Sequence, residues 1–193
     1  MNEWVFNYIE NQKRALDSID TTALWRVIQR LEEARENDRQ VFVFGNGGSG
    51  ANASHFATDL GKEASEVVGP FRVVSLNDNG PWMTAIANDY RYSDVFSRQL
   101  NNYARPKDIV ISASVSGASP NLIEAFRLAK ERGLYRVALV GGQCGPLAQL
   151  ADESIVVDSE HYGQVEDCQM TILHMLCYAF VEKALDGATS HAG

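Results

Sequence analysis

The chain has 193 residues, of which 45% are hydrophobic, and a formal net charge of −8. This length and composition suit a single domain with a sizeable core, and they exclude collagen-like, low-complexity and small disulfide-stapled proteins. No run of about 18 apolar residues occurs, and the amino terminus lacks the basic stretch and apolar core of a secretory signal. We therefore expect a soluble, cytoplasmic protein that has no membrane partner.

The charge of the chain limits its partners. With 25 acidic against 17 basic residues, the protein repels polyanions at long range, so we expect no nucleic-acid partner. A small anionic ligand is compatible with this charge, because a few backbone N–H groups at a helix amino terminus suffice to hold it. The three cysteines, at positions 144, 168 and 177, form no CxxC pair, which argues against a disulfide framework and predicts buried thiols.

Residues 1–38 predict two amphipathic helices. Apolar side chains recur at helical spacing in two stretches, and Asp20 with the two threonines that follow it signals a helix start between them. An α/β domain does not need such a pair to close its own sheet, so we expect their apolar faces to pack against another subunit. The apolar positions are Trp4, Val5, Tyr8 and Ile9, then Leu24, Val27, Ile28 and Leu31.

Residues 39–185 predict an α/β core. Five short runs of β-branched and aromatic residues alternate with helical segments, which is typical of a five-stranded parallel sheet with helices on both faces. The runs are 41–44, 72–75, 109–112, 137–140 and 154–157. We expect helices near 49–63, 81–88, 92–104, 119–132 and 164–185, a short helix or turn over 144–151, and a frayed tail over 186–193. The chain is thus interpreted as one domain.

Two loops of unusual composition follow the first and third runs, where open parallel sheets bind their ligands. The first reads Gly45-Asn46-Gly47-Gly48-Ser49-Gly50, whose glycines permit positive φ and close backbone approach. The second, residues 112–121, contains four serines and then Pro120, which suits the first position of a helix. Each loop alone could be a tight turn or a solvated segment. Together they predict a phosphate cradle.

The glycine spacing of the first loop also matches the fingerprint of dinucleotide-binding folds. That fingerprint expects an acidic residue about 20 positions further on, and Asp78 lies well past this distance. Since a lone fingerprint is weak evidence, the nucleotide-binding alternative stays open but is disfavoured.

Four polar side chains on two predicted helices are candidates for chemistry. His55 and Asp59 are four residues apart and hence on one face, where they can share a proton or a metal ion. Glu166 and His174 are eight residues apart, about 80° around the axis and about 12 Å along it, which is long for two ligands of one ion. Glu166 suits a first helical turn electrostatically, whereas His174, in an apolar run, is either a hydrogen-bonded core residue or a site residue.

The ordered set of motifs resembles the sugar isomerase (SIS) domain family, and within it the phosphoheptose isomerases. The resemblance rests on the glycine loop followed by His55-Phe56-Ala57, on the serine loop, and on the helix ending His174-Met175-Leu176-Cys177. It includes the segments 84–90 (TAIANDY) and 95–99 (VFSRQ), and it covers nearly the whole chain, to about Lys183.

This resemblance implies a flavodoxin-like sheet, four chains assembled through helical bundles, and active sites between subunits. It implies isomerisation of a phosphorylated ketose, sedoheptulose 7-phosphate, to a heptose 7-phosphate aldose. The family moves protons with a glutamate and a histidine, and the matching residues are Asp59, as base at C1, and His174, as its partner acid/base. The implied substrate-binding residues are Asn46, Gly47, Gly48, Ser49, Asn88, Asp89, Ser114, Val115, Ser116, Ser119 and Glu166.

Some family members bind zinc, and the residues that match their ligands are His55, Asp59, Glu166 and His174. Three positions depart from the family pattern. Asp59 replaces a glutamate and is one methylene shorter, Glu166 replaces a glutamine and adds charge beside an anionic substrate, and Val115 replaces a threonine and removes a hydroxyl from the cradle. Two carboxylates and two imidazoles would nevertheless suit a divalent metal well.

Two further alternatives stay open. Some relatives in this family are tetrameric regulators that bind the replication initiator protein and lack the acid/base pair, but Asp59 and His174 argue against that role here. The other alternative is an SIS enzyme for a hexose or amino-sugar phosphate, which substrate profiling would separate from a heptose enzyme.

Overall fold

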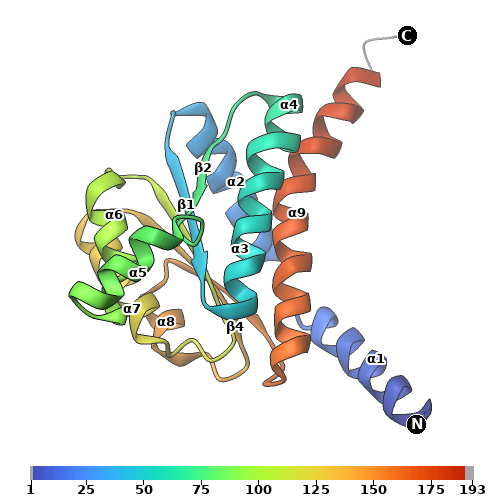
Figure 1. Ribbon diagram of the computed structural model, residues 1–193. Helices are drawn as coiled ribbons and strands as arrows, with labels where there is room; N and C mark the ends of the chain where they lie inside the picture. Colours follow the sequence, from blue (N-terminus) through green and yellow to red (C-terminus); the bar gives the residue numbers. More distant parts are fainter. Residues whose placement is uncertain (1, 190–193) are drawn as a thin grey trace.

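A computed structural model describes residues 2–189 of the chain, and the side chains of residues 2–182. The fold has three layers, with helices on both faces of a five-stranded parallel sheet (Figure 1). The strands run in the order β2-β1-β3-β4-β5, so the chain reverses its direction of winding between β1 and β3. Their bounds are β1 (Gln40–Gly45), β2 (Arg72–Ser75), β3 (Ile109–Ser114), β4 (Tyr135–Gly141) and β5 (Glu153–Val157). The predicted α/β fold class and all five strands are confirmed.

The alternation of side chains along β1 explains the layers. Val41 and Val43 point into one core cluster, and Phe42 and Phe44 point into the other, as the two-residue period of a strand requires. The first cluster joins the sheet to α2 (Thr21–Glu36), α3 (Gly47–Asp59) and α9 (Tyr162–Thr189). The second joins it to α5 (Gly80–Asp89), α6 (Ser97–Tyr103), α7 (Pro120–Glu131) and α8 (Gly145–Leu150).

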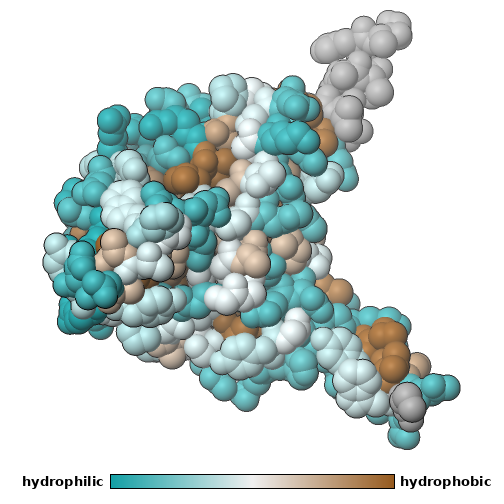
Figure 2. Space-filling model, in the orientation of Figure 1, coloured by the Kyte–Doolittle hydropathy of each residue, from teal (hydrophilic) through white to brown (hydrophobic). Residues whose placement is uncertain are grey.

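The amino-terminal helices differ in how well the rest of the chain covers them. Asp20 caps α2, because its Oδ1 accepts hydrogen bonds from the N–H groups of Thr22, at 2.8 Å, and Ala23, at 3.1 Å. Helix α1 (Asn2–Asp17) projects from the body beside α9 (Figure 1), and Ala15 is its one buried residue. Brown, apolar surface therefore remains open on α1 (Figure 2).

Three predicted helices have other bounds in the structure. The helix expected over 92–104 is divided into a 3₁₀ turn, η2 (Tyr92–Asp94), and α6. The helix expected over 49–63 ends its regular part at Asp59 and continues as a π-helical turn, η1 (Leu60–Ala64), and α4 (Ser65–Val68). Helix α9 extends through Thr189, into the segment expected to be a frayed tail, and residues 190–193 lie outside the described part of the chain. No described helix has the length and apolarity needed to cross a membrane.

The cysteine thiols differ in burial, which makes their reactivity predictable. Cys168 and Cys177 are fully buried, and burial raises the pKa of Cys177 to about 11. Cys144 is only partly buried, unlike the expectation for it. At pH 8 a thiol of that pKa is about 0.1% thiolate. With a disulfide reagent such as DTNB, the folded protein should therefore release one equivalent rapidly, and a denatured control should release all three.

That rapid equivalent should disappear in Cys144→Ser. Fast reaction of Cys177 in the folded state would contradict the burial described here.

Candidate functional site

The first predicted loop lies where parallel sheets bind ligands. Because β1 and β3 are neighbours on either side of the winding reversal, with Gly45 beside Ala113, the loops that leave them emerge together. Gly47 has a φ of 53°, which disfavours a side chain at this position. Ser49 is buried, and its hydroxyl donates to Gln169 Oε1 at 2.8 Å. This loop therefore presents backbone groups rather than the Ser49 hydroxyl.

The second loop is braced by its own serines. The Oγ atom of Ser114 accepts a hydrogen bond from the N–H of Gly117, and that of Ser116 accepts one from Ala118. Ser119 begins α7 without forming a side-chain cap. Val115 is only 7% exposed and belongs to the core cluster beneath α9, so its backbone is what it offers to a ligand.

Asn121 and Tyr92 also belong to this region, although their sequence context did not predict it. The side-chain amides of Asn46 and Asn121 form two reciprocal hydrogen bonds of 3.0 and 2.8 Å between the loops. The hydroxyl of Tyr92 donates to Asn46 Oδ1 at 3.2 Å. Two loops that are far apart in the sequence are thus tied at their bases.

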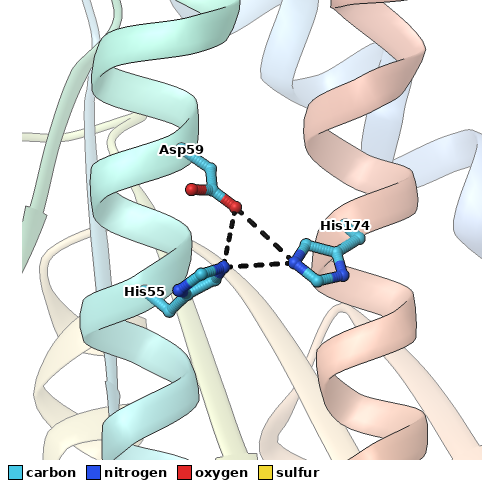
Figure 3. Close-up of side chains that lie close together, drawn as sticks. All are labelled: His55, Asp59 and His174. Carbon is cyan, nitrogen blue, oxygen red and sulfur yellow. Dashed lines mark hydrogen bonds and ion pairs between the residues drawn. The ribbon is translucent and has the colours of Figure 1, made fainter.

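A cluster of three side chains lies between α3 and α9 (Figure 3). His55 and Asp59 project from adjacent turns of α3, as their spacing predicted, and His174 reaches them from α9. The Nε2 atoms of the two histidines are 3.2 Å apart. Asp59 Oδ2 lies 3.1 Å from His55 Nε2 and 3.6 Å from His174 Nε2. His174 therefore lies outside the apolar core, in contact with the other two side chains.

The geometry of this triad suits a metal ion. Zinc binds imidazole nitrogen and carboxylate oxygen at about 2.0 to 2.2 Å, so two ligands of a tetrahedral site are about 3.3 Å apart. The three separations in the triad, 3.1, 3.2 and 3.6 Å, are close to this value. Three protein ligands also leave a fourth position open, as catalytic sites require. The donor set therefore fits a divalent ion.

Glu166, the fourth predicted ligand, lies at another place. Its carboxylate packs against Gly48 so closely that a Cβ on Gly48 would meet it. Its backbone oxygen accepts a hydrogen bond of 2.9 Å from Asn52 Nδ2. Among the described residues, the group that could hold a metal comprises His55, Asp59 and His174 without Glu166. Glu166 is thus separated from His174, as the helix spacing predicted. Within one chain it lies beside the glycine loop at the start of α3.

Asn88 and Asp89 lie at the end of α5, in the opposite helix layer. Both side chains are exposed, and Asn88 Nδ2 donates to Asp89 Oδ1 at 2.9 Å. This hydrogen bond joins the two side chains to each other, and not to the loops or to the triad. Their contact with substrate remains a prediction.

Tyr178 and Glu63 flank the triad and were not predicted. Tyr178 Oη donates to Glu63 Oε2 at 3.1 Å, and this hydrogen bond raises the pKa of Tyr178 above its ordinary value. The Tyr178 ring stands edge-on to His174, with the ring centroids 6.2 Å apart. Glu63 lies in η1, the π-helical turn directly after Asp59. Such turns often occur at functional sites.

Comparison with known proteins settles the family. Residues 6–141 match the model of the SIS domain. The chain is 36% identical over 176 residues to a probable phosphoheptose isomerase of Thermoplasma acidophilum, covering 91% of this chain and 97% of that protein. It is 32% identical over 197 residues to the phosphoheptose isomerase of Geotalea daltonii, covering 97% and 98%. The chain belongs to the phosphoheptose isomerase family of SIS-domain proteins.

Solved structures of phosphoheptose isomerases share this fold over almost their whole length. The enzyme from Francisella tularensis superposes with a TM-score of 0.86 at 25% identity, covering 94% of this chain and 96% of that one. The enzyme from Neisseria gonorrhoeae superposes with a TM-score of 0.85 at 28% identity, covering 93% and 97%. The resemblance inferred from the sequence motifs is thereby confirmed.

Proposed function

We propose that this protein isomerises sedoheptulose 7-phosphate to a heptose 7-phosphate aldose. The observation that carries the proposal is the triad of His55, Asp59 and His174, which lies where α3 packs against α9 in a phosphoheptose isomerase fold. Relatives named phosphoheptose isomerase support the substrate class. The triad disfavours a purely regulatory role, because such a role needs no carboxylate and imidazole in contact.

The chemistry requires two proton transfers at carbon and one between oxygens. Moving the carbonyl from C2 to C1 removes a proton from C1, passes through an enediolate and returns a proton to C2, while the hydroxyl proton of O1 moves to O2. Asp59 takes the proton from C1, and the oxygen that points away from both rings in Figure 3 is the one that does so. His174 supplies the proton to C2, from the ring nitrogen that a bound metal ion would leave free. Its position against Asp59 Oδ2 places both groups at the same end of the substrate.

The phosphate is held at the amino-terminal end of α3, away from the triad. The backbone groups of Gly47, Gly48 and Ser49 at the start of α3, with the loop of Ser114, Ser116 and Ser119, form the cradle. The backbone groups of Asn46 and Val115 add to this cradle, and Glu166, Asn88 and Asp89 complete the proposed contacts, to the hydroxyl groups of the sugar rather than to its phosphate. The chain of the sugar then extends along α3 from the loop toward His55.

A divalent ion, which we propose to be zinc, would be held by His55, Asp59 and His174. When bound, it supplies a Lewis acid that polarises the oxygens of the substrate. Glu166 would join the ligands only through movement of its side chain or from a neighbouring subunit. Equilibrium binding of zinc, measured by calorimetry, should give one site per chain in the wild type and none in His174→Gln.

We propose that four chains assemble through their amino-terminal helices in the cytoplasm. Phe6 and Ile9 on α1 are 63% and 49% exposed, and an apolar face of this kind on a projecting helix needs a partner. The double variant Phe6→Glu/Ile9→Glu should therefore elute as a smaller species in size-exclusion chromatography with light scattering. Asn7→Glu, which adds charge to the same helix at a polar position, is the matched control. An unchanged mass for the double variant would contradict this role of α1.

The activity is tested by incubating sedoheptulose 7-phosphate with metal-free protein, with and without added zinc, and following the sugar by NMR. New aldose resonances establish the reaction, and their dependence on zinc assigns the role of the metal. Hexose and amino-sugar phosphates in parallel samples test the alternative substrates. Binding of the heptose phosphate without turnover in either sample would overturn the proposal.

A further inference from the structure

Asn46 occupies a helix N-cap but does not cap the helix. Its backbone has the extended conformation of an N-cap residue, with φ −107° and ψ 151°, yet its side chain accepts no hydrogen bond from α3. Asn79, at the same position of α5, does what such a residue ordinarily does and accepts a hydrogen bond from the N–H of Trp82 at 3.1 Å. The side chain of Asn46 therefore does not cap α3, although its position suits capping.

The hydrogen bonds of Asn46 explain why. Its Oδ1 accepts from Asn121 Nδ2 at 2.8 Å and from the Tyr92 hydroxyl at 3.2 Å, while its Nδ2 donates to Asn121 Oδ1 at 3.0 Å. Asn121 is only 2% exposed, in the first turn of α7, so its amide is held in place. The oxygen that would cap α3 is thus occupied by two donors from other segments.

This arrangement matters because of what lies at the start of α3. The first N–H groups of a helix attract anions, and here they adjoin the serine loop in the proposed phosphate cradle. The carboxylate of Glu166 lies against Gly48 in the same turn and repels a phosphate. Binding there therefore depends on the N–H groups of this turn not being taken by another acceptor.

We propose that Asn121 and Tyr92 are positioning residues that hold the Asn46 amide away from the first turn of α3, so that its N–H groups are available to the substrate phosphate. The inference rests on the proposed function and deepens it. Its consequence is specific: without Asn121, the Asn46 oxygen is free to rotate onto the N–H of Gly48 or Ser49 and competes with the phosphate. If Asn121 only joined the two loops, its loss would not create a competitor for the phosphate.

The test compares single and double variants by two measurements. Calorimetry gives the Kd of inorganic phosphate, which serves as the probe, and steady-state kinetics on sedoheptulose 7-phosphate give KM and kcat. Asn121→Ala should weaken phosphate binding and raise KM about tenfold, with kcat within about twofold and no loss of thermal stability, since a freed Asn46 caps α3. Tyr92→Phe should change Kd and KM in the same direction by a smaller factor. Asn37→Ala, which removes another asparagine side chain far from the loops, should change neither.

The double variant Asn46→Ala/Asn121→Ala distinguishes competition from simple loop tying. Competition predicts that it binds phosphate more tightly than Asn121→Ala, because the competing oxygen is gone. A Kd equal to or weaker than that of Asn121→Ala would overturn the inference, as would an unchanged Kd in the single variant. If Asn121→Ala fails to fold, Tyr92→Phe and Tyr92→Phe/Asn46→Ala provide the same comparison, since Tyr92 is 56% exposed.

The two proposals fail in different ways. A wild-type protein that binds phosphate but does not isomerise the heptose overturns the proposed function, and the Kd series still decides the role of Asn121. A wild-type protein that binds neither phosphate nor the sugar overturns both.

Discussion

Replacing His174 by glutamine should lower kcat by a factor between about 10² and 10⁴ without changing the molecular mass of the protein in solution from that of the wild type. Glutamine approximates the size of imidazole and can donate a hydrogen bond, but it cannot carry a proton to C2. His174 is 43% exposed at its side chain and lies outside the core clusters, so its replacement costs little stability. Turnover measured by NMR, together with light scattering on the same sample, checks both statements.

The matched control for this variant is Met175→Gln, because Met175 is the exposed neighbour of His174 on α9. It should retain activity within a few-fold. Wild-type turnover in His174→Gln would remove His174 from the mechanism.

Lengthening Asp59 to glutamate should also slow the reaction, by about a hundredfold. The Asp59 carboxylate already lies 3.1 and 3.6 Å from the two imidazoles, so an added methylene moves it by about 1.5 Å into groups that are in contact with it. The spacing of the triad therefore suits the shorter acid, although the resemblance to the family implies a glutamate at this position. The structure thus predicts a loss of rate, and not a gain, for this substitution.

Asp59→Asn serves as the comparison, because it keeps the size of the side chain and removes the base. We expect it to lose at least as much activity as Asp59→Glu. Faster turnover in Asp59→Glu than in the wild type would show that the short side chain is a handicap and that the geometry of the triad is not the working one.

The layers and strands could be predicted from the sequence because they follow from periodicity. The alternation of Val41 and Val43 with Phe42 and Phe44 is visible in the sequence, and the structure places each pair in its own core cluster. The division of the 92–104 helix and the π-helical turn after Asp59 were not predictable in this way. Both interrupt a regular helical pattern, and the π-helical turn contacts another element, through the hydrogen bond of Glu63 with Tyr178 on α9.

The site was predictable to different degrees. The pairing of His55 with Asp59 followed from helical spacing, whereas bringing His174 to them required the packing of α9 against α3. Glu166 was predicted as a ligand from its match to the family, but within one chain it does not lie with the triad. Asn121 and Tyr92 were not predictable, because a polar residue near a helix start has an ordinary structural explanation.

Isomerisation in D₂O tests most directly that Asp59 and His174 move the two protons. If Asp59 removes a proton from C1 and His174, whose protons exchange with solvent, delivers another to C2, the aldose formed in D₂O should carry deuterium at C2. NMR of the product reads this position. Product formed without deuterium at C2 would contradict a two-group proton transfer through an enediolate, and so would the absence of any aldose.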